Sequence, residues 1–128
     1  MQHWWRNDGG TWAWFIGGTF GAGISANSPP CMIQGQYGMA NEYGNGNFEL
    51  CVALPDGTVQ HWWRNNQVPG FPWSLSATFG SDVDCVVALV EGSFGFNLEL
   101  IVLRRDGMLQ HYWRAGPTWH AGAVIGPA

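Results

Sequence analysis

The sequence repeats one short segment of aromatic and polar residues. Gln-His-Trp-Trp-Arg-Asn occupies Gln2–Asn7 and Gln60–Asn65, and a third copy, Gln-His-Tyr-Trp-Arg, occupies Gln110–Arg114. The copies therefore start 58 and 50 residues apart. After each copy come a loop, a tryptophan and, six residues later, an apolar residue followed by glycine; the tryptophans are Trp14, Trp73 and Trp119. Self-similarity at this period predicts an array of equivalent structural units.

The two later copies each follow an apolar run and a tight turn. The run Asn47–Leu54 leads into Asp56-Gly57, and the run Leu98–Arg104 leads into Asp106-Gly107. Asp-Gly between two apolar runs is a strong β-hairpin signal, because both residues tolerate positive φ. No segment shows helical periodicity. The chain is therefore predicted to be all-β.

One repeat is predicted to contain four strands, named A to D in chain order. Strands A and B are apolar on both faces, which suits sheets packed between neighbouring sheets. Four strands at this period are typical of a β-propeller blade. In the first complete repeat the strands are Cys31–Gln36, Asn47–Leu54, Val59–Asn65 and Trp73–Thr78, and in the second they are Cys85–Val90, Leu98–Arg104, Leu109–Arg114 and Trp119–Val124.

The predicted fold is an all-β partial β-propeller, an open arc of about 2.5 four-stranded antiparallel blades with roughly ten strands. Residues 1–21 form a half blade of strands C and D, and residues 22–80 and 81–128 form a full blade each. Together they make one propeller-type domain or a fragment of one. A closed propeller has about 4–8 blades. We therefore expect further blades as partners, either in cis in a longer parent chain, which we favour, or in trans in an oligomer.

Charged residues are sparse, which excludes some classes of partner. The net charge is -4, lysine is absent and five arginines are the only strong bases, which argues against binding to a nucleic-acid backbone. No apolar run approaches the roughly 18 residues of a membrane span, and no signal-peptide pattern is visible. The three cysteines lie in apolar runs without metal or redox spacing, so we expect small buried side chains. The compartment stays unknown; a secreted or extracellular location, as part of a longer chain, is one option.

The order of these features resembles that of tectonin-like and bacterial fucose-lectin β-propeller repeats. The resemblance covers nearly the whole chain and implies a propeller fold and a lectin-like activity with glycans as partners. The Trp-Trp-Arg-Asn segment and the long A–B connection at 39–46 depart from the family pattern. In the last repeat the matching residues are Asp84–Val87, Leu100–Leu103, Asp106-Gly107, Leu109–Trp113, Trp119 and Gly126.

Alternation along strand C defines the candidate binding residues. Neighbouring residues of a strand point to opposite faces, so the Gln, the first aromatic residue and the Arg of each copy share one face. Aromatic walls with a few polar groups are typical of small-ligand pockets, and a buried Arg needs a partner. We expect shallow sugar sites between blades, formed by Gln2, Trp4, Arg6, Gln60, Trp62, Arg64, Gln110, Tyr112 and Arg114.

An alternative is that the aromatic residues form the core between blades, with Arg packed on them through cation–π contacts. We favour this for Trp5, Trp63 and Trp113 on the opposite face and for the strand D residues Trp14, Trp73 and Trp119. It stays open for Trp4, Trp62 and Tyr112.

Glu49 and Glu99 occupy matching positions among apolar residues of strand B. A carboxylate there needs a partner, so we expect an ion pair or hydrogen bond to a strand C Arg or His. Their repetition favours a scaffold role over catalysis. The histidines lack metal-ligand spacing. The sequence therefore predicts no catalytic residue, cofactor or metal, and a carbohydrate-binding module; the alternative is a non-catalytic propeller scaffold segment of a larger secreted enzyme or toxin.

Overall fold

A computed structural model describes residues 1–37 and 46–128, which contain strands and no helix. Ten strands form three antiparallel sheets in this part of the chain. The first sheet pairs β1 (Gln2–Arg6) with β2 (Trp14–Thr19). The second sheet runs in the order β3 (Cys31–Gln34), β4 (Phe48–Ala53), β5 (Val59–Arg64) and β6 (Trp73–Phe79). The third runs in the order β7 (Val83–Glu91), β8 (Leu98–Arg104), β9 (Met108–Ala115) and β10 (Thr118–Pro127). No helix that could cross a membrane is found among these residues.

The strand prediction is confirmed in number and order, and the boundaries differ by a few residues. β10 continues to Pro127, beyond the expected end at Val124, because Gly126 and Pro127 still pair with Leu109 and Met108. β3 ends at Gln34 instead of Gln36. The long connection expected at 39–46 lies, apart from Gly46, outside the described residues.

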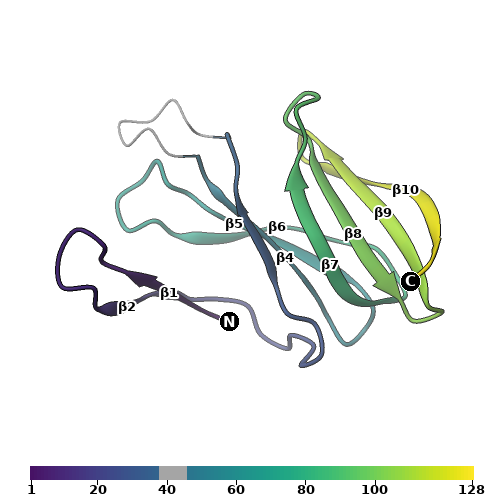
Figure 1. Cartoon of the computed structure of the whole chain (residues 1–128), viewed down its shortest axis with the longest axis horizontal. Helices are drawn as coiled ribbons and strands as arrows, with labels where there is room; N and C mark the ends of the chain where they lie inside the picture. The colour runs from purple at the N-terminus through teal and green to yellow at the C-terminus, as the bar shows by residue number, and fades with distance from the viewer. Residues whose placement is uncertain (38–45) are drawn as a thin grey trace.

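The three sheets follow one another in space in the order of the chain and do not close on themselves (Figure 1). The buried core and the two cavities described below lie between neighbouring sheets.

Both Asp-Gly turns form as predicted. Gly57 and Gly107 adopt φ values of 90° and 81°, a region that favours glycine. Asp56 Oδ1 accepts hydrogen bonds from the backbone N (2.9 Å) and the Oγ1 (2.7 Å) of Thr58, which lower the pKa of Asp56. Asp106 Oδ1 accepts the matching bond from Met108 N at 3.1 Å. In both complete sheets, an aspartate side chain thus stabilises the turn that connects strand B to strand C.

Each pair of C and D strands carries a bulge beside its histidine. The register shifts next to His3 in the first sheet, next to His61 in the second, and between Ala121 and Val124 in the third. A Cβ added to the bulge residue Gly17 would lie 2.6 Å from His3 Nδ1. The glycine therefore lets the β2 backbone approach the imidazole closely.

An aromatic cluster recurs at both junctions between sheets. At the second junction, Phe79 stacks on Trp119 with ring centroids 4.4 Å apart and meets Tyr112 edge-on at 5.4 Å. At the first junction, Phe20 stacks on Trp73 at 4.3 Å and lies 5.3 Å from Trp62. The phenylalanine at the end of strand D, Phe79 in β6 and Phe20 directly after β2, thus packs against strands C and D of the next sheet. Stacked aromatic pairs of this kind stabilise by about 0.5–1.5 kcal/mol beyond their buried area.

The main buried core lies between the second and third sheets. Ser28 Oγ bridges them by accepting hydrogen bonds from Ala53 N (3.4 Å) and Val86 N (3.3 Å). Of the cysteines, Cys51 is buried, whereas Cys31 and Cys85 are partly buried. The buried members of the cluster are Cys51, Ala53, Val59, Val83, Val86, Leu89, Leu98, Leu100, Val102 and Tyr112.

Two leucine substitutions test whether this core carries the stability. Leu100 is fully buried, whereas Leu75 on β6 is 46% exposed. Leu100→Ala should lower the free energy of unfolding by about 2–5 kcal/mol, because it leaves a cavity in the core. Leu75→Ala removes the same atoms at the surface and should change it by about 0.5 kcal/mol. Urea unfolding measures both, and equal losses would contradict the placement of the core.

Candidate functional site

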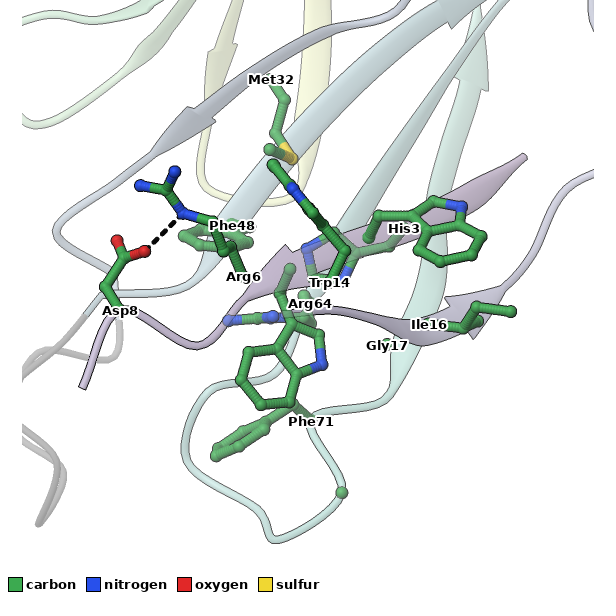
Figure 2. Close-up of a pocket in the computed structure, with 13 residues that line it drawn as sticks. His3, Arg6, Asp8, Trp14, Ile16, Gly17, Met32, Phe48, Arg64 and Phe71 are labelled. Carbon is green, nitrogen blue, oxygen red and sulfur yellow. Dashed lines mark hydrogen bonds and ion pairs between the residues drawn. The ribbon is translucent and has the colours of Figure 1, made fainter. Parts of the chain in front are cut away.

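A cavity of about 880 Å³ lies between the first and second sheets. The first sheet contributes aromatic side chains of β1 and β2, and the second sheet contributes residues of β3, β4, β5 and the loop after β5 (Figure 2). The lining residues are His3, Trp4, Trp5, Arg6, Asp8, Trp14, Ile16, Gly17, Met32, Phe48, Arg64, Gly70 and Phe71.

Arg64 is the fixed cation of this cavity. Its guanidinium lies over the Phe48 ring, 4.0 Å from the centroid, and 5.4 Å from the Phe71 centroid. Its Nε donates to Asn66 Oδ1 at 2.7 Å, and burial lowers the pKa of the guanidinium, which stays charged at neutral pH. Among the described residues, the Nη atoms of Arg64 make no hydrogen bond, so they remain available to a ligand.

Arg6 supplies a second cation from the first sheet. Its Nε donates to Asp8 Oδ1 at 2.5 Å, and its guanidinium lies 4.9 Å from the Trp12 centroid and 5.9 Å from that of Trp14. Trp14 is 62% exposed and offers its ring to the cavity. The cavity therefore combines two guanidinium groups, a carboxylate and open aromatic faces, a set that suits a small polar ligand with an apolar side.

A smaller cavity, of about 230 Å³, lies between the second and third sheets. It is lined by Tyr37, Asn47, Glu49, Trp63, Ser76, Arg114, Gly116 and Pro117.

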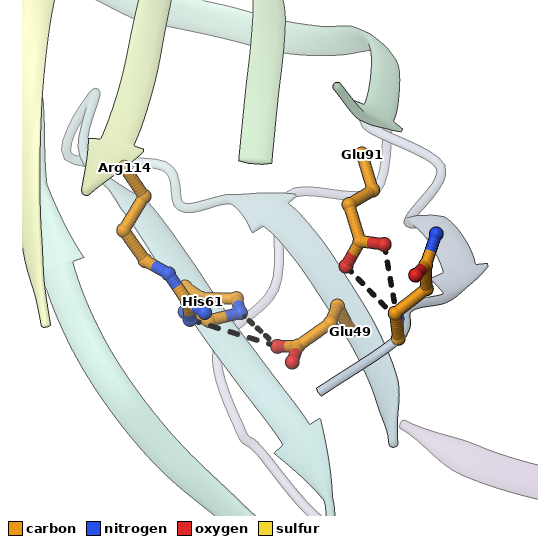
Figure 3. Close-up of polar contacts among 5 residues, drawn as sticks. Glu49, His61, Glu91 and Arg114 are labelled. Carbon is orange, nitrogen blue, oxygen red and sulfur yellow. Dashed lines mark hydrogen bonds and ion pairs between the residues drawn. The ribbon is translucent and has the colours of Figure 1, made fainter. Parts of the chain in front are cut away.

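A buried polar network forms one wall of the smaller cavity (Figure 3). His61 Nε2 lies 2.7 Å from Glu49 Oε2, and Arg114 Nη1 lies 3.4 Å from His61 Nδ1 and 3.7 Å from Glu49 Oε2. Because Nδ1 faces a donor, these contacts assign a neutral imidazole that donates from Nε2 to Glu49. Burial lowers the pKa of His61, and the hydrogen bond to Glu49 acts against that effect. In the third sheet, His111 Nε2 lies 2.6 Å from Glu99 Oε2, so the expected partners of both glutamates are confirmed.

The two cavities are built from matching positions of the repeat. Trp5 and Trp63, the second tryptophans of strand C, come from the earlier sheet, whereas Arg64 and Arg114 come from the later one. Strand alternation explains this, because an inter-sheet groove receives opposite faces of the two strand C copies.

The structure brings together some of the predicted site residues and separates the others. Trp4, Arg6 and Arg64 line the larger cavity, and Arg114 lines the smaller one. Gln2 and Gln60 line neither cavity, and Gln60 Oε1 accepts a hydrogen bond from Trp62 Nε1 at 3.0 Å.

Two predicted site residues belong to the junctions between sheets, and a third is buried within its own sheet. Trp62 packs on Phe20, and Tyr112, 8% exposed, packs on Phe79. Gln110 is 6% exposed, and its Nε2 donates to the backbone oxygens of His111, Gly122 and Ala123. These side chains, like those of Gln2 and Gln60, line neither cavity.

Two tryptophans for which the sequence predicts core positions are exposed. Trp5 is 44% and Trp14 62% exposed, and both line the larger cavity. No further sheet of the described chain packs on the first sheet opposite the second. Trp73 and Trp119 do lie at the junctions, stacked on Phe20 and Phe79.

Several lining residues are not among the predicted site residues. Core positions are predicted for Trp5 and Trp63, His3 lies on the same strand face as Trp5, and Met32, Phe48 and Phe71 come from other strands or loops. Strand alternation could have indicated His3, Trp5 and Trp63 as lining residues. A groove between two sheets is lined by one strand face of the first sheet and by the opposite strand face of the next.

Comparison with known proteins matches the fold to a lectin β-propeller. No family model matches the chain, and no curated protein matches it. The Aleuria aurantia lectin N224Q mutant in complex with alpha-methyl-L-fucoside superposes with a TM-score of 0.63 at 18% identity, over 90% of this chain and 36% of that one. The same mutant with Fucalpha1-6GlcNAc gives a TM-score of 0.60 at 19% identity, over 88% and 37%. The chain thus has the fold of a β-propeller segment and spans about a third of the length of these lectins; the likeness to tectonin-like repeats in particular stays a prediction.

The neutral state of buried His61 predicts a pH dependence of stability. The pKa of His61 in the folded chain lies below its ordinary 6.5, so at acidic pH the unfolded chain binds a proton at His61 more readily than the folded chain does. The free energy of unfolding should fall as the pH drops below that value, by at most about 1.4 kcal/mol per pH unit from this residue. Urea unfolding from pH 5 to 8 with NMR titration of the His61 Hε1 signal measures both; titration at or above 6.5 would contradict the prediction.

The two glutamates should differ in their contribution to stability. Glu49 is buried and contacts both His61 and Arg114, whereas Glu99 is partly exposed and pairs with His111. Glu49→Gln should cost about 3 kcal/mol, because it leaves the Arg114 charge without its buried partner. Glu99→Gln, the matched control, should cost about 1 kcal/mol. Chemical denaturation of both variants measures the loss in free energy of unfolding. Equal losses would contradict the prediction, because they would show that the Arg114 charge does not need Glu49 as a partner.

Proposed function

We propose that the chain is a carbohydrate-binding β-propeller module with shallow binding sites between its sheets, and that the larger cavity is its main site. The observation that carries this proposal is the pairing, in one cavity, of Arg64 held over Phe48 with the exposed ring of Trp14. Aromatic faces pack on the apolar side of a pyranose, and guanidinium Nη atoms donate to its hydroxyl groups. A volume of about 880 Å³ is within the usual range of small-ligand sites.

The solved lectins support the choice of ligand class. Both are complexes of a fucose-containing ligand with a protein of the same fold. The matching cavity between the second and third sheets, with Trp63 and Arg114, is proposed as a second and smaller site. Repeated weak sites gain affinity for multivalent glycans through avidity. Further blades, in cis or in trans, are proposed to extend the series.

A glycan array followed by calorimetry with the best monosaccharide tests the proposal. Binding with a stoichiometry of one or two is expected for a chain with two cavities. A folded protein that binds no glycan would overturn it and leave the alternative, a scaffold segment of a larger secreted enzyme or toxin.

Arg64→Ala should weaken sugar binding about 10- to 150-fold, the range for loss of hydrogen bonds from a charged group. Trp14→Ala removes the exposed stacking face, which is not part of the core, and should weaken binding without loss of stability. The controls are Arg105→Ala, in the turn before β9, and Phe94→Ala, 87% exposed and outside both cavities. Calorimetry and thermal unfolding are measured together. Unchanged affinity in both cavity variants would place the site elsewhere.

A further inference from the structure

We propose that the free edge of β1 is the docking site of a β-hairpin related to β3–β4 and β7–β8, whose second strand presents a glutamate to His3 and Arg64. This inference concerns an interaction surface of the first sheet that shares Arg64 with the proposed sugar site.

The edge of β1 is the first observation. In the second and third sheets, strand C pairs on both sides, since β5 lies between β4 and β6 and β9 lies between β10 and β8. In the described part of the chain, β1 pairs with β2 alone. The other side of β1 therefore presents a row of open backbone donors and acceptors, ready to accept a strand.

His3 is the second observation. It corresponds to His61 and His111, whose Nε2 atoms lie 2.7 and 2.6 Å from Glu49 and Glu99. His3 lies edge-on against Trp73 at 5.7 Å, just as His61 lies edge-on against Trp119 at 5.4 Å. No carboxylate pairs with His3 among the described residues, and its Nδ1 is buried without a hydrogen-bond partner, whereas Nδ1 of His61 lies 3.4 Å from Arg114 Nη1. His3 thus shares the strand position and the tryptophan contact of His61 but has, among these residues, neither the acid at Nε2 nor the arginine contact at Nδ1.

Charge complementarity at this edge favours an incoming carboxylate. Arg64 corresponds to Arg114, which approaches both His61 and Glu49 at the next junction. Burial and the neighbouring Arg64 charge lower the pKa of His3. A glutamate delivered beside His3 would meet an imidazole donor and a guanidinium together, as Glu49 does (Figure 3).

Register defines the sequence that the hairpin must carry. Glu49 and Leu50 stand opposite Trp63 and Trp62, and Glu99 and Leu100 stand opposite Trp113 and Tyr112. The residues before these glutamates, Phe48 and Leu98, stand opposite Arg64 and Arg114. The docked strand should therefore read apolar-Glu-Leu opposite Arg6, Trp5 and Trp4. Trp4 and Trp5 are exposed, whereas Trp62 and Trp63, which stand opposite β4, are partly buried. The docked strand would flank Trp4 and Trp5 as β4 flanks Trp62 and Trp63.

A second copy of β1 does not meet this requirement. The strand reads Gln-His-Trp-Trp-Arg and contains no acid, so pairing of two β1 edges would bring no carboxylate to His3. The chain's own strands with the Glu-Leu sequence, β4 and β8, are already paired on both sides. The occupant is therefore a hairpin in addition to those of the described sheets.

The test adds such a hairpin to the full chain. A copy of residues 81–108 is fused ahead of Met1, so that its own Asp-Gly turn leads into β1 with the spacing seen before β9. Hydrogen exchange of the β1 amides should slow by about tenfold or more, and the melting temperature should rise. The His3 Nε2 proton should become visible by NMR as a slowly exchanging, hydrogen-bonded signal.

The matched control carries Glu99→Gln in the fused copy alone. It should keep the slowed exchange of the β1 amides and lose the His3 signal and part of the gain in melting temperature. If the fusion does not fold, the same segment is added as a synthetic peptide to the unfused chain, and β1 exchange is measured again.

Three results would overturn the proposal: β1 amides that exchange equally fast with and without the hairpin, fusions with Glu and Gln that cannot be told apart, or an unfused chain that dimerises in sedimentation with β1 protected only in the dimer. The last would assign the edge to a second copy. These measurements follow the pairing of β1 and the His3 proton and not sugar binding, so a failure here is distinguishable from a failure of the proposed carbohydrate site, with which the docked glutamate would share Arg64.

Discussion

The stacking of one sheet on the next through a shared aromatic cluster is the interaction on which the rest of the structure depends. Phe20 on Trp73 and Phe79 on Trp119 set the spacing of neighbouring sheets. At this spacing, the aromatic rings fill one end of each junction, and the other end stays open as a cavity. Without this contact, each sheet would expose apolar residues on both faces, and no groove would exist to hold a ligand.

A polar network lies beside the aromatic cluster at the second junction, and only part of it is present at the first. At the second junction, His61 joins Glu49 of its own sheet to Arg114 of the next. The charge of Arg114 is therefore paired with Glu49 at this junction, where the cavity is about 230 Å³. At the first junction, no acid among the described residues pairs with His3, the Nη atoms of Arg64 make no hydrogen bond with these residues, and the cavity is about 880 Å³. Arg64 thus belongs both to the proposed sugar site and to the proposed docking edge.

The strands, turns and Glu–His pairs could be predicted from sequence because local rules govern them. Asp56-Gly57 forms its turn through hydrogen bonds within three residues, and Glu49 finds His61 because adjacent strands in a hairpin fix their register. The candidate site was predicted only in part. Arg64, Arg6, Trp4 and Arg114 do line cavities, but Tyr112 is buried at a junction and Gln110 is buried within its own sheet. Identical repeat positions differ in exposure according to which sheet covers them, and a repeat pattern does not carry that information.

The sequence by itself determined an all-β chain of repeated four-stranded units, the position of each hairpin, and the two faces of strand C, since alternation and turn chemistry act over a few residues. Only the tertiary structure decided which face becomes core and which becomes cavity wall. Trp14 and Trp119 hold the same place in the repeat, yet Trp14 is open to solvent and Trp119 is stacked on Phe79. The physical reason is that burial depends on the neighbouring sheet: a preceding sheet packs on Trp119, and none in the described chain packs on Trp14.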